Sequence, residues 1–284
     1  MKLVKGIDIF GGIPNIQNQL QVNSSGVHTA ETRNGIQYDA NSYIPKHDWR
    51  SLSKEETKLL VNNTTQFSNY SKSLYIGEIP HNLKKLFTSL GLENCKHPDE
   101  VYPAFEKNKE LVKKINEELH FFLENSSSTK DYKFHRITRA MPNRETITCH
   151  YIDDAFIYIG LHIDQSRPFK VHTAYKSGNR ISINLSNESR TLLFTNLTLI
   201  QAYNLLSQKI DVKKTELSPN NITQYFFKYF PDYPVIKMEI KPYQFYVAPT
   251  DNFFHDASTY GNKEIDMTIV YTGLFDQLPQ LSKV

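Results

Sequence analysis

The feature that most restricts the fold of this chain is a series of short apolar segments in its second half, each bounded by Gly, Pro, Asn or Asp. They are rich in Ile, Val, Tyr, Phe and Thr and span residues 145–152, 155–163, 169–176, 180–186, 190–195, 235–240, 244–249 and 265–275. In one of them Ile181, Ile183 and Leu185 alternate with polar residues, which gives a strand one apolar and one polar face. Short strands separated by turns predict a sandwich or barrel, and so a mainly β fold with flanking helices.

Helical patterns surround these strands. Ser53 and Glu56 have the spacing of a capping box, which predicts a short helix ending near Val61. A longer helix is expected from about Pro103 to Asn125, with an apolar stripe at helical spacing. Residues 197–234 are again helix-like and polar, as in an insertion that acts as a lid. We therefore expect a mixed α/β N-terminal extension over residues 1–130, packed on a β core over residues 131–284.

Composition excludes several classes of protein. The 284 residues are 39% hydrophobic and 22% charged, which is typical of a globular protein. The net charge is only +3 and the Lys and Arg residues are scattered, which argues against a nucleic-acid partner. No stretch approaches the roughly 20 apolar residues of a membrane helix, and no signal peptide is evident. We expect a cytoplasmic monomer or homodimer that binds neither membrane nor nucleic acid.

Three residues suggest a metal site. His162 and Asp164 lie two apart at the end of an apolar strand, so both side chains point to the same face. His255 follows in a later apolar segment and can supply a third ligand. The plain alternative is a buried, hydrogen-bonded His–Asp pair at a strand end. His97 and Asp99 have the same spacing, but they lie in a polar loop without the rigid backbone that a ligand pair needs.

Two imidazoles and one carboxylate on one face form a facial triad, which suits iron(II) because it leaves adjacent coordination positions open. The same donor set with a water molecule can serve zinc-dependent hydrolysis. We predict that His162, Asp164 and His255 are both the metal ligands and the catalytic residues.

The stretch from His150 to Phe275 resembles the iron(II)/2-oxoglutarate dioxygenase superfamily. The resemblance is carried by the approach from Cys149 to Asp154, the strand from Tyr158 to Asp164, and the later His255. It implies a double-stranded β-helix (jelly-roll) core, with iron(II), the cosubstrate 2-oxoglutarate and O2. Halogenating relatives replace the carboxylate by a small residue, so Asp164 implies hydroxylation, desaturation or ring closure instead.

The resemblance also implies a basic residue that binds the far carboxylate of 2-oxoglutarate. Many members have an Arg on the last strand, but Ile265–Tyr271 contains no Arg or Lys. Other branches use a basic residue on a middle strand. Arg180 is our first choice, because a guanidinium can bind a carboxylate through two hydrogen bonds. Arg190 and Lys176 are the reserves, and Asn184 is a further candidate for binding cosubstrate or substrate.

The function expected from the sequence is therefore hydroxylation of an unactivated C–H bond in a small molecule, such as a free amino acid or a natural-product intermediate. One alternative is a protein or nucleobase hydroxylase of the same superfamily. Another is a cupin-like barrel that binds a metal or ligand and has no oxygenase activity.

Overall fold

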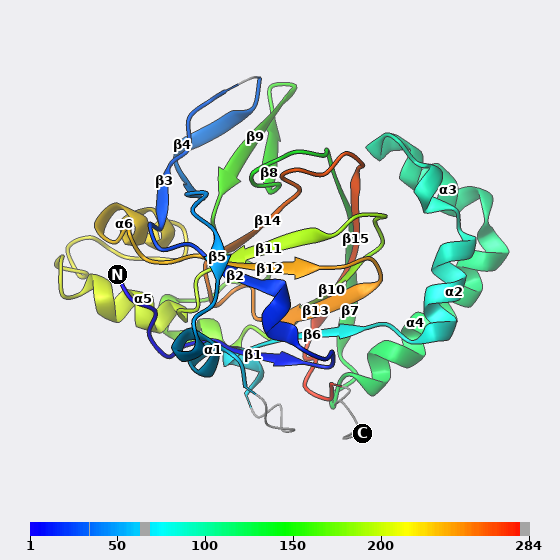
Figure 1. Cartoon of the computed structure of the whole chain (residues 1–284), viewed down its shortest axis with the longest axis horizontal. Coiled ribbons are helices and arrows are strands. Elements are labelled where there is room, and N and C mark those ends of the chain that lie inside the picture. The colour runs from blue at the N-terminus through cyan, green and yellow to red at the C-terminus, as the bar shows by residue number, and fades with distance from the viewer. Residues whose placement is uncertain (34, 63–68, 279–284) are drawn as a thin grey trace.

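A computed structural model of the chain describes residues 1–33, 35–62 and 69–278. Its centre is a pair of facing β-sheets, with helices at both ends (Figure 1). The larger sheet has the order β1 (Asp8–Gly11), β6 (Ser73–Glu78), β13 (Gln244–Ala248), β10 (Asn179–Asn184), β15 (Asp266–Gly273) and β7 (Tyr132–Ala140). The second sheet has the order β14 (His255–Ser258), β11 (Arg190–Phe194), β12 (Ile236–Ile240), β2 (Leu20–Val22) and β5 (Arg50–Ser51).

The C-terminal strands alternate between the two sheets as in a jelly roll. From β10 onward the chain passes to β11 and β12 in the second sheet, to β13 in the first, to β14 in the second and to β15 in the first. A bridge between His162 and His255 places the chain at His162 beside β14. The core is therefore two four-membered antiparallel layers, β7-β15-β10-β13 and the His162 segment-β14-β11-β12. The expected mainly β jelly-roll fold is confirmed.

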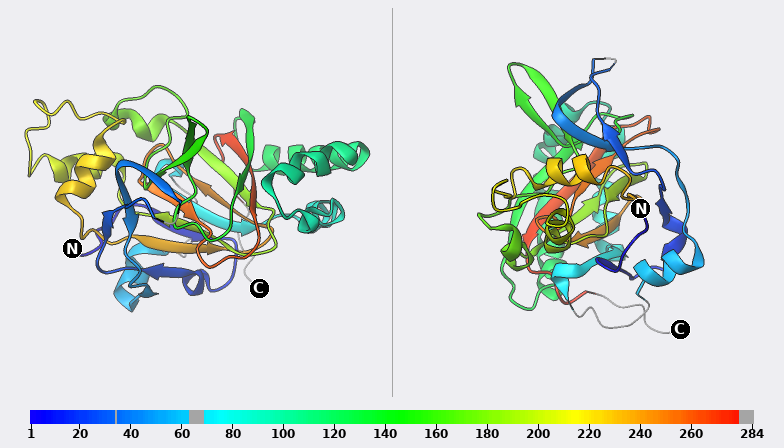
Figure 2. Two further views of the ribbon diagram at one scale, coloured as in Figure 1. Left: turned by 90° about the horizontal axis from the view of Figure 1, so that it is seen from above. Right: turned by 90° about the vertical axis from the view of Figure 1, so that its left-hand side faces the viewer.

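A third sheet projects beside the core and consists of β3 (Val27–Thr29), β4 (Gln37–Pro45), β9 (Ala155–Gly160) and β8 (Cys149–Ile152). The helices are α1 (Lys54–Leu60), α2 (His81–Ser89), α3 (Val101–Lys107), α4 (Lys109–Asn125), α5 (Leu199–Leu206) and α6 (Ile222–Tyr229). Figure 2 shows α2, α3 and α4 at one end of the molecule, and α5 and α6 at the other. Among the described residues, no helix combines the length and apolar character needed to cross a bilayer.

The alternation predicted for β10 determines which face of the larger sheet is covered. Ile181 and Ile183 are fully buried in an apolar cluster with residues of α2 and α4, including Phe87 and Leu119. Ser182, on the opposite face, lines a cavity between the sheets. The apolar face of this sheet is therefore covered by helices, and its polar face is left for the interior of the barrel.

Two predicted elements need correction. Residues 169–176, expected as a strand, contain instead a 3-10 helix at Val171–Lys176. The Thr173 hydroxyl accepts a hydrogen bond from Lys170 N–H at 3.0 Å, and the buried residues Val171 and Ala174 are three apart, as a 3-10 turn requires. The single helix expected from Pro103 to Asn125 is two helices, α3 and α4, which are interrupted at Asn108.

Other predictions are confirmed in part. The capping box at Ser53 and Glu56 opens α1 as expected. Residues 197–234 contain α5 and α6, which pack into the core, and no residue of this range lines the cavity that holds His162. The lid role expected for the segment stays a prediction. Residues before 130 add strands to both large sheets, and the boundary between extension and core stays a prediction.

Candidate metal centre

The turn after β9 places His162 and Asp164. Gly160 has φ +66°, and a Cβ at this position would lie 2.4 Å from Tyr43 O, so only glycine allows the strand to turn here. The turn brings His162 beside β14, where its backbone exchanges two hydrogen bonds with His255, at 3.0 and 2.8 Å. Asp164 N–H donates to Thr250 O at 3.1 Å. The ligand candidates are therefore fixed by backbone pairing between segments distant in the chain.

The three side chains converge on one point. His162, Asp164 and His255 each offer a ligand atom, and these atoms all lie within 4.8 Å of one another. His255 Nε2 is 3.4 Å from Asp164 Oδ2, and His162 Nε2 is 3.8 Å from Asp164 Oδ1. A single cation can thus bind all three, as the sequence predicted.

Hydrogen bonds orient both imidazoles for metal binding. His162 Nδ1 lies 2.9 Å from Gly160 O, and His255 Nδ1 lies 3.3 Å from Phe253 O. A carbonyl is only an acceptor, so each Nδ1 carries the proton and each Nε2 keeps its lone pair for an ion. The tautomers follow from these contacts. This donor set fits an iron(II) ion.

The carboxylates make this position favourable for positive charge. Burial alone would raise the pKa of Asp164, but His162, His255 and Arg180 together hold it well below its usual range. Burial lowers the pKa of His162, but Asp164 and Asp256 outweigh it and raise that pKa overall. Without a metal ion, the two carboxylates favour the protonated, positively charged imidazole. A bound metal ion supplies positive charge at the same place and can replace that proton.

Asp256 is a residue whose role the sequence did not reveal. It is fully buried behind His162, with Oδ2 at 3.9 Å from His162 Nδ1. Its Oδ1 accepts hydrogen bonds from Thr148 N–H at 3.2 Å and Thr148 Oγ1 at 2.8 Å. Its position directly after His255 was the available signal, but only the folded chain shows that its carboxylate lies close to the other histidine.

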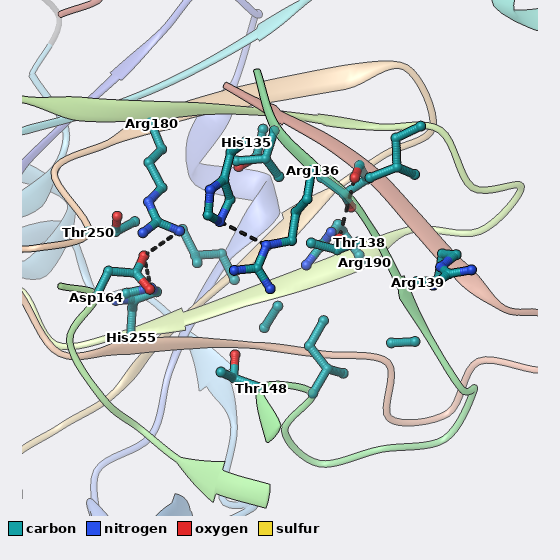
Figure 3. A pocket seen from close by; sticks show the side chains of 18 of the residues that line it. His135, Arg136, Thr138, Arg139, Thr148, Asp164, Arg180, Arg190, Thr250 and His255 are labelled. Carbon is teal, nitrogen blue, oxygen red and sulfur yellow. Dashed lines mark hydrogen bonds and ion pairs between the residues drawn. The ribbon is translucent and has the colours of Figure 1, made fainter. Parts of the chain in front are cut away.

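The triad opens onto a cavity of about 400 Å³ between the two main sheets. Figure 3 shows Asp164 and His255 at one side of this cavity with Arg180 directed at them, and His135 and Arg136 nearby. Arg180 Nη1 lies 3.0 Å from Asp164 Oδ2, and its Nη2 donates to Ser166 Oγ at 2.9 Å. Arg180 therefore lies at the metal end of the cavity.

Arg190 is at the other end of the lining. It begins β11, four residues before Phe194, which pairs with His255, so the two positions are about 13 Å apart along the sheet. Its side chain is 5% exposed, and Nη1 is 3.2 Å from Asp266 Oδ2. Nε has no hydrogen-bond partner among the described residues. Asp266 begins the last core strand, so Arg190 lies next to that strand although the strand itself carries no basic residue.

Two other sequence candidates are placed away from the metal. Asn184 is fully buried at the end of β10, where its Nδ2 donates to Glu188 O and Ile240 O and its Oδ1 accepts from Ser186 N–H. These contacts hold the turn between strands, and Asn184 is not among the residues that line the cavity. His97 caps a 3-10 helix at Pro98–Glu100, and no described metal-binding group includes it.

The chain thus combines a jelly-roll fold with the HxD…H triad of iron(II)/2-oxoglutarate dioxygenases. Comparison with protein-family models and with curated proteins finds no match. Among solved structures, the chain is similar to "the Kdo hydroxylase KdoO, a non-heme Fe(II) alphaketoglutarate dependent dioxygenase". The complex with cobalt(II) matches with 14% identity and a TM-score of 0.38, over 72% of this chain and 80% of that one.

The complex of the same hydroxylase with alphaketoglutarate and Fe(III) matches with 14% identity and a TM-score of 0.39, over 84% of this chain and 88% of that one. Overlap at this level is too low to transfer a substrate or a residue role.

Proposed function

We propose that this protein is an iron(II)/2-oxoglutarate-dependent oxygenase that hydroxylates a small molecule. The observation that carries the proposal is the convergence of two Nε2 atoms and one carboxylate on a single point at the wall of a cavity. A facial triad leaves the remaining coordination positions directed into that space. The cavity volume, about 400 Å³, is in the range of small-molecule pockets, which favours such a substrate over a protein or nucleobase.

The residues have separate tasks in this reaction. Nε2 of His162, Nε2 of His255 and the carboxylate of Asp164 would hold iron(II), while Asp256 adds a negative charge 3.9 Å from Nδ1 of His162. When bound, iron(II) with 2-oxoglutarate supplies the oxidising power to insert an oxygen atom from O2 into a C–H bond. Enclosure between the two sheets limits the access of water to the reacting groups.

We assign the far carboxylate of 2-oxoglutarate to Arg190 in preference to Arg180, our first choice from the sequence. Arg180 already contacts Asp164, which is too close to the ion for the distal end of a five-carbon diacid. Arg190 is buried at a distance from the triad, and its Nε, like that of Arg180, has no hydrogen-bond partner among the described residues, so the distance decides between the two. The Thr268 hydroxyl, which lines the same cavity, is also buried without a hydrogen-bond partner among the described residues. In this assignment, the ion pair with Arg180 holds the carboxylate of Asp164 in position.

The test is anaerobic reconstitution with iron(II) and 2-oxoglutarate, followed by exposure to O2 and measurement of succinate with a panel of small molecules. We expect an iron(II)–2-oxoglutarate absorption band and succinate formation. Asp164→Ala should remove both, while the double variant His97→Ala/Asp99→Ala, at the same sequence spacing outside the site, should retain both. Tight binding of zinc without either signal would instead support the cupin-like alternative.

A further inference from the structure

Strand β7 contains an irregularity that faces the cavity. Its pairing with β15 matches Val270 with Arg136 but Tyr271 with Phe134, so His135 is an extra residue in this strand. Figure 3 shows the side chains of the consecutive residues His135 and Arg136 together at the cavity, whereas consecutive residues of a regular strand point to opposite faces. Bulges of this kind redirect side chains next to functional sites.

The extra residue holds Arg136 in a defined orientation. Arg136 Nε donates to His135 Nε2 at 2.8 Å, which makes that ring nitrogen an acceptor (Figure 3). Burial, and then the neighbouring charges of Arg180 and Arg136, lower the pKa of His135, in agreement with a neutral ring. Both terminal nitrogens of the Arg136 guanidinium remain without a hydrogen-bond partner in the described part of the chain. They form a fork that suits two oxygens of one anion.

The described lining of the cavity has more arginines than carboxylates that could pair with them. It contains four arginines and one carboxylate, that of Asp164. Arg180 is paired with Asp164, and Arg190 with Asp266. The fourth is Arg139, which donates to Pro98 O at 3.0 Å and lies 4.4 Å over the Tyr102 ring.

Like Arg139, Arg136 makes no ion pair with a described carboxylate, and its one described side-chain partner is the ring of His135. Arg136 is an exposed arginine at the edge of the cavity, held by a neighbouring side chain and without its own counterion, and is therefore arranged for an anionic ligand.

We propose that Arg136, oriented by His135, binds a carboxylate or phosphate group of the substrate. The proposal rests on the oxygenase function above and narrows its substrate class to anionic small molecules. The two carboxylates of 2-oxoglutarate do not remove the excess, because one binds at the metal and the other is assigned to Arg190.

The first test compares Arg136→Gln with the wild-type protein in succinate formation, using small acids paired with their neutral amides or esters. We expect the acids to stimulate turnover, and Arg136→Gln to raise the KM for a stimulating acid about tenfold or more, with kcat at saturation and the KM for 2-oxoglutarate little changed. Arg136→Lys should restore part of the affinity. Arg33→Gln, an exposed arginine in the β3–β4 connection, is the matched control and should have no effect.

A second test needs no turnover. Sulfate, a weak metal ligand, is titrated calorimetrically into protein loaded with iron(II) and 2-oxoglutarate. We expect binding to the wild-type protein that weakens about tenfold in Arg136→Gln and is unchanged in Arg33→Gln. Equal sulfate binding by wild type and Arg136→Gln, equal stimulation by neutral compounds, or a raised KM for 2-oxoglutarate alone would overturn the proposal.

The experiments distinguish failure of the oxygenase function from failure of the anionic-substrate proposal. Loss of the iron(II)–2-oxoglutarate band in the wild-type protein rejects the oxygenase, while the sulfate titration still reports on Arg136. A normal band in every variant, with no anion dependence, rejects only the anionic substrate.

Discussion

At the scale of single residues, the centre is organised by charges that lie outside the triad. Asp256 stands behind His162, Arg180 beside Asp164, and Asp266 beside Arg190. Each of these contacts places a charged group within 4 Å of a residue to which the proposed reaction gives a role. At such distances in a buried site, removing one charge changes the pKa and the ligand affinity of the neighbouring group.

Asp256→Asn tests this for metal binding. The substitution keeps the size of the side chain but removes the negative charge that supports His162. We expect metal affinity to fall about 10- to 100-fold, the usual effect of losing a supporting carboxylate. Competition against a chelator of known affinity measures it, with circular dichroism as the folding control. Unchanged affinity would show that Gly160 O alone orients the imidazole.

Arg190→Met tests the assigned cosubstrate anchor. We expect the KM for 2-oxoglutarate to rise at least tenfold, because a charge-assisted pair is lost. The variant also leaves Asp266, 1% exposed, as an unpaired buried carboxylate, which costs about 3–5 kcal/mol of stability. Arg190→Met/Asp266→Asn should recover part of that stability without recovering the KM, as denaturant unfolding alongside kinetics will show. If the KM is unaffected in both variants, another residue holds the cosubstrate.

At the scale of elements, local signals in the sequence predicted what local interactions determine. The capping box at Ser53 and the alternation in β10 could be predicted from the sequence, because each depends on residues that are close together in the chain. The strand predicted at 169–176 failed, since β-branched and aromatic residues there serve a 3-10 turn packed against the core. The four-residue β14, His255–Ser258, is too short to show periodicity and is a strand because it pairs with β11.

The sequence likewise predicted the metal-ligand candidates but not the contacts between distant parts of the chain that complete the site. His162, Asp164 and His255 were identified by residue type and spacing, but their convergence depends on pairing across the jelly roll. The Arg190–Asp266 pair joins two sheets and leaves no local pattern in the sequence. The bulge at His135 is likewise defined only by its partner strand.

The start of α1 gives a pH-dependent prediction. The hydrogen bonds from the Arg50 guanidinium are the main cause that lowers the pKa of Glu56 from 4.5 to about 2. Partial burial acts in the opposite direction, and the hydrogen bond from the Ser53 backbone N–H lowers the pKa further. A lowered pKa stabilises the fold above pH 4.5, and this contribution is lost as the pH falls toward 2. Glu56→Gln should therefore cost about 1 kcal/mol near pH 6, with the difference from wild type shrinking below pH 4.5. Urea unfolding of both proteins across this range measures it, and a constant difference would contradict the assignment.

At the scale of the whole molecule, the metal centre joins segments that lie far apart in the chain. The His162 segment follows the projecting third sheet and pairs with His255 at the edge of the second sheet. An ion bound by both segments would add a crosslink present only in the folded state. Metal binding should for that reason stabilise the whole fold.

Thermal unfolding tests this coupling. An ion at 100 times its dissociation constant adds about 2.7 kcal/mol to the stability of a protein that binds it only when folded. For a domain of this size that corresponds to a rise in Tm of roughly 5 °C or more. We expect this rise with manganese(II), which avoids oxidation during heating, and no rise in Asp164→Ala. His97→Ala/Asp99→Ala should respond as the wild type does. An equal rise in Asp164→Ala would mean that the ion binds elsewhere, and the convergence of the triad would then be structural.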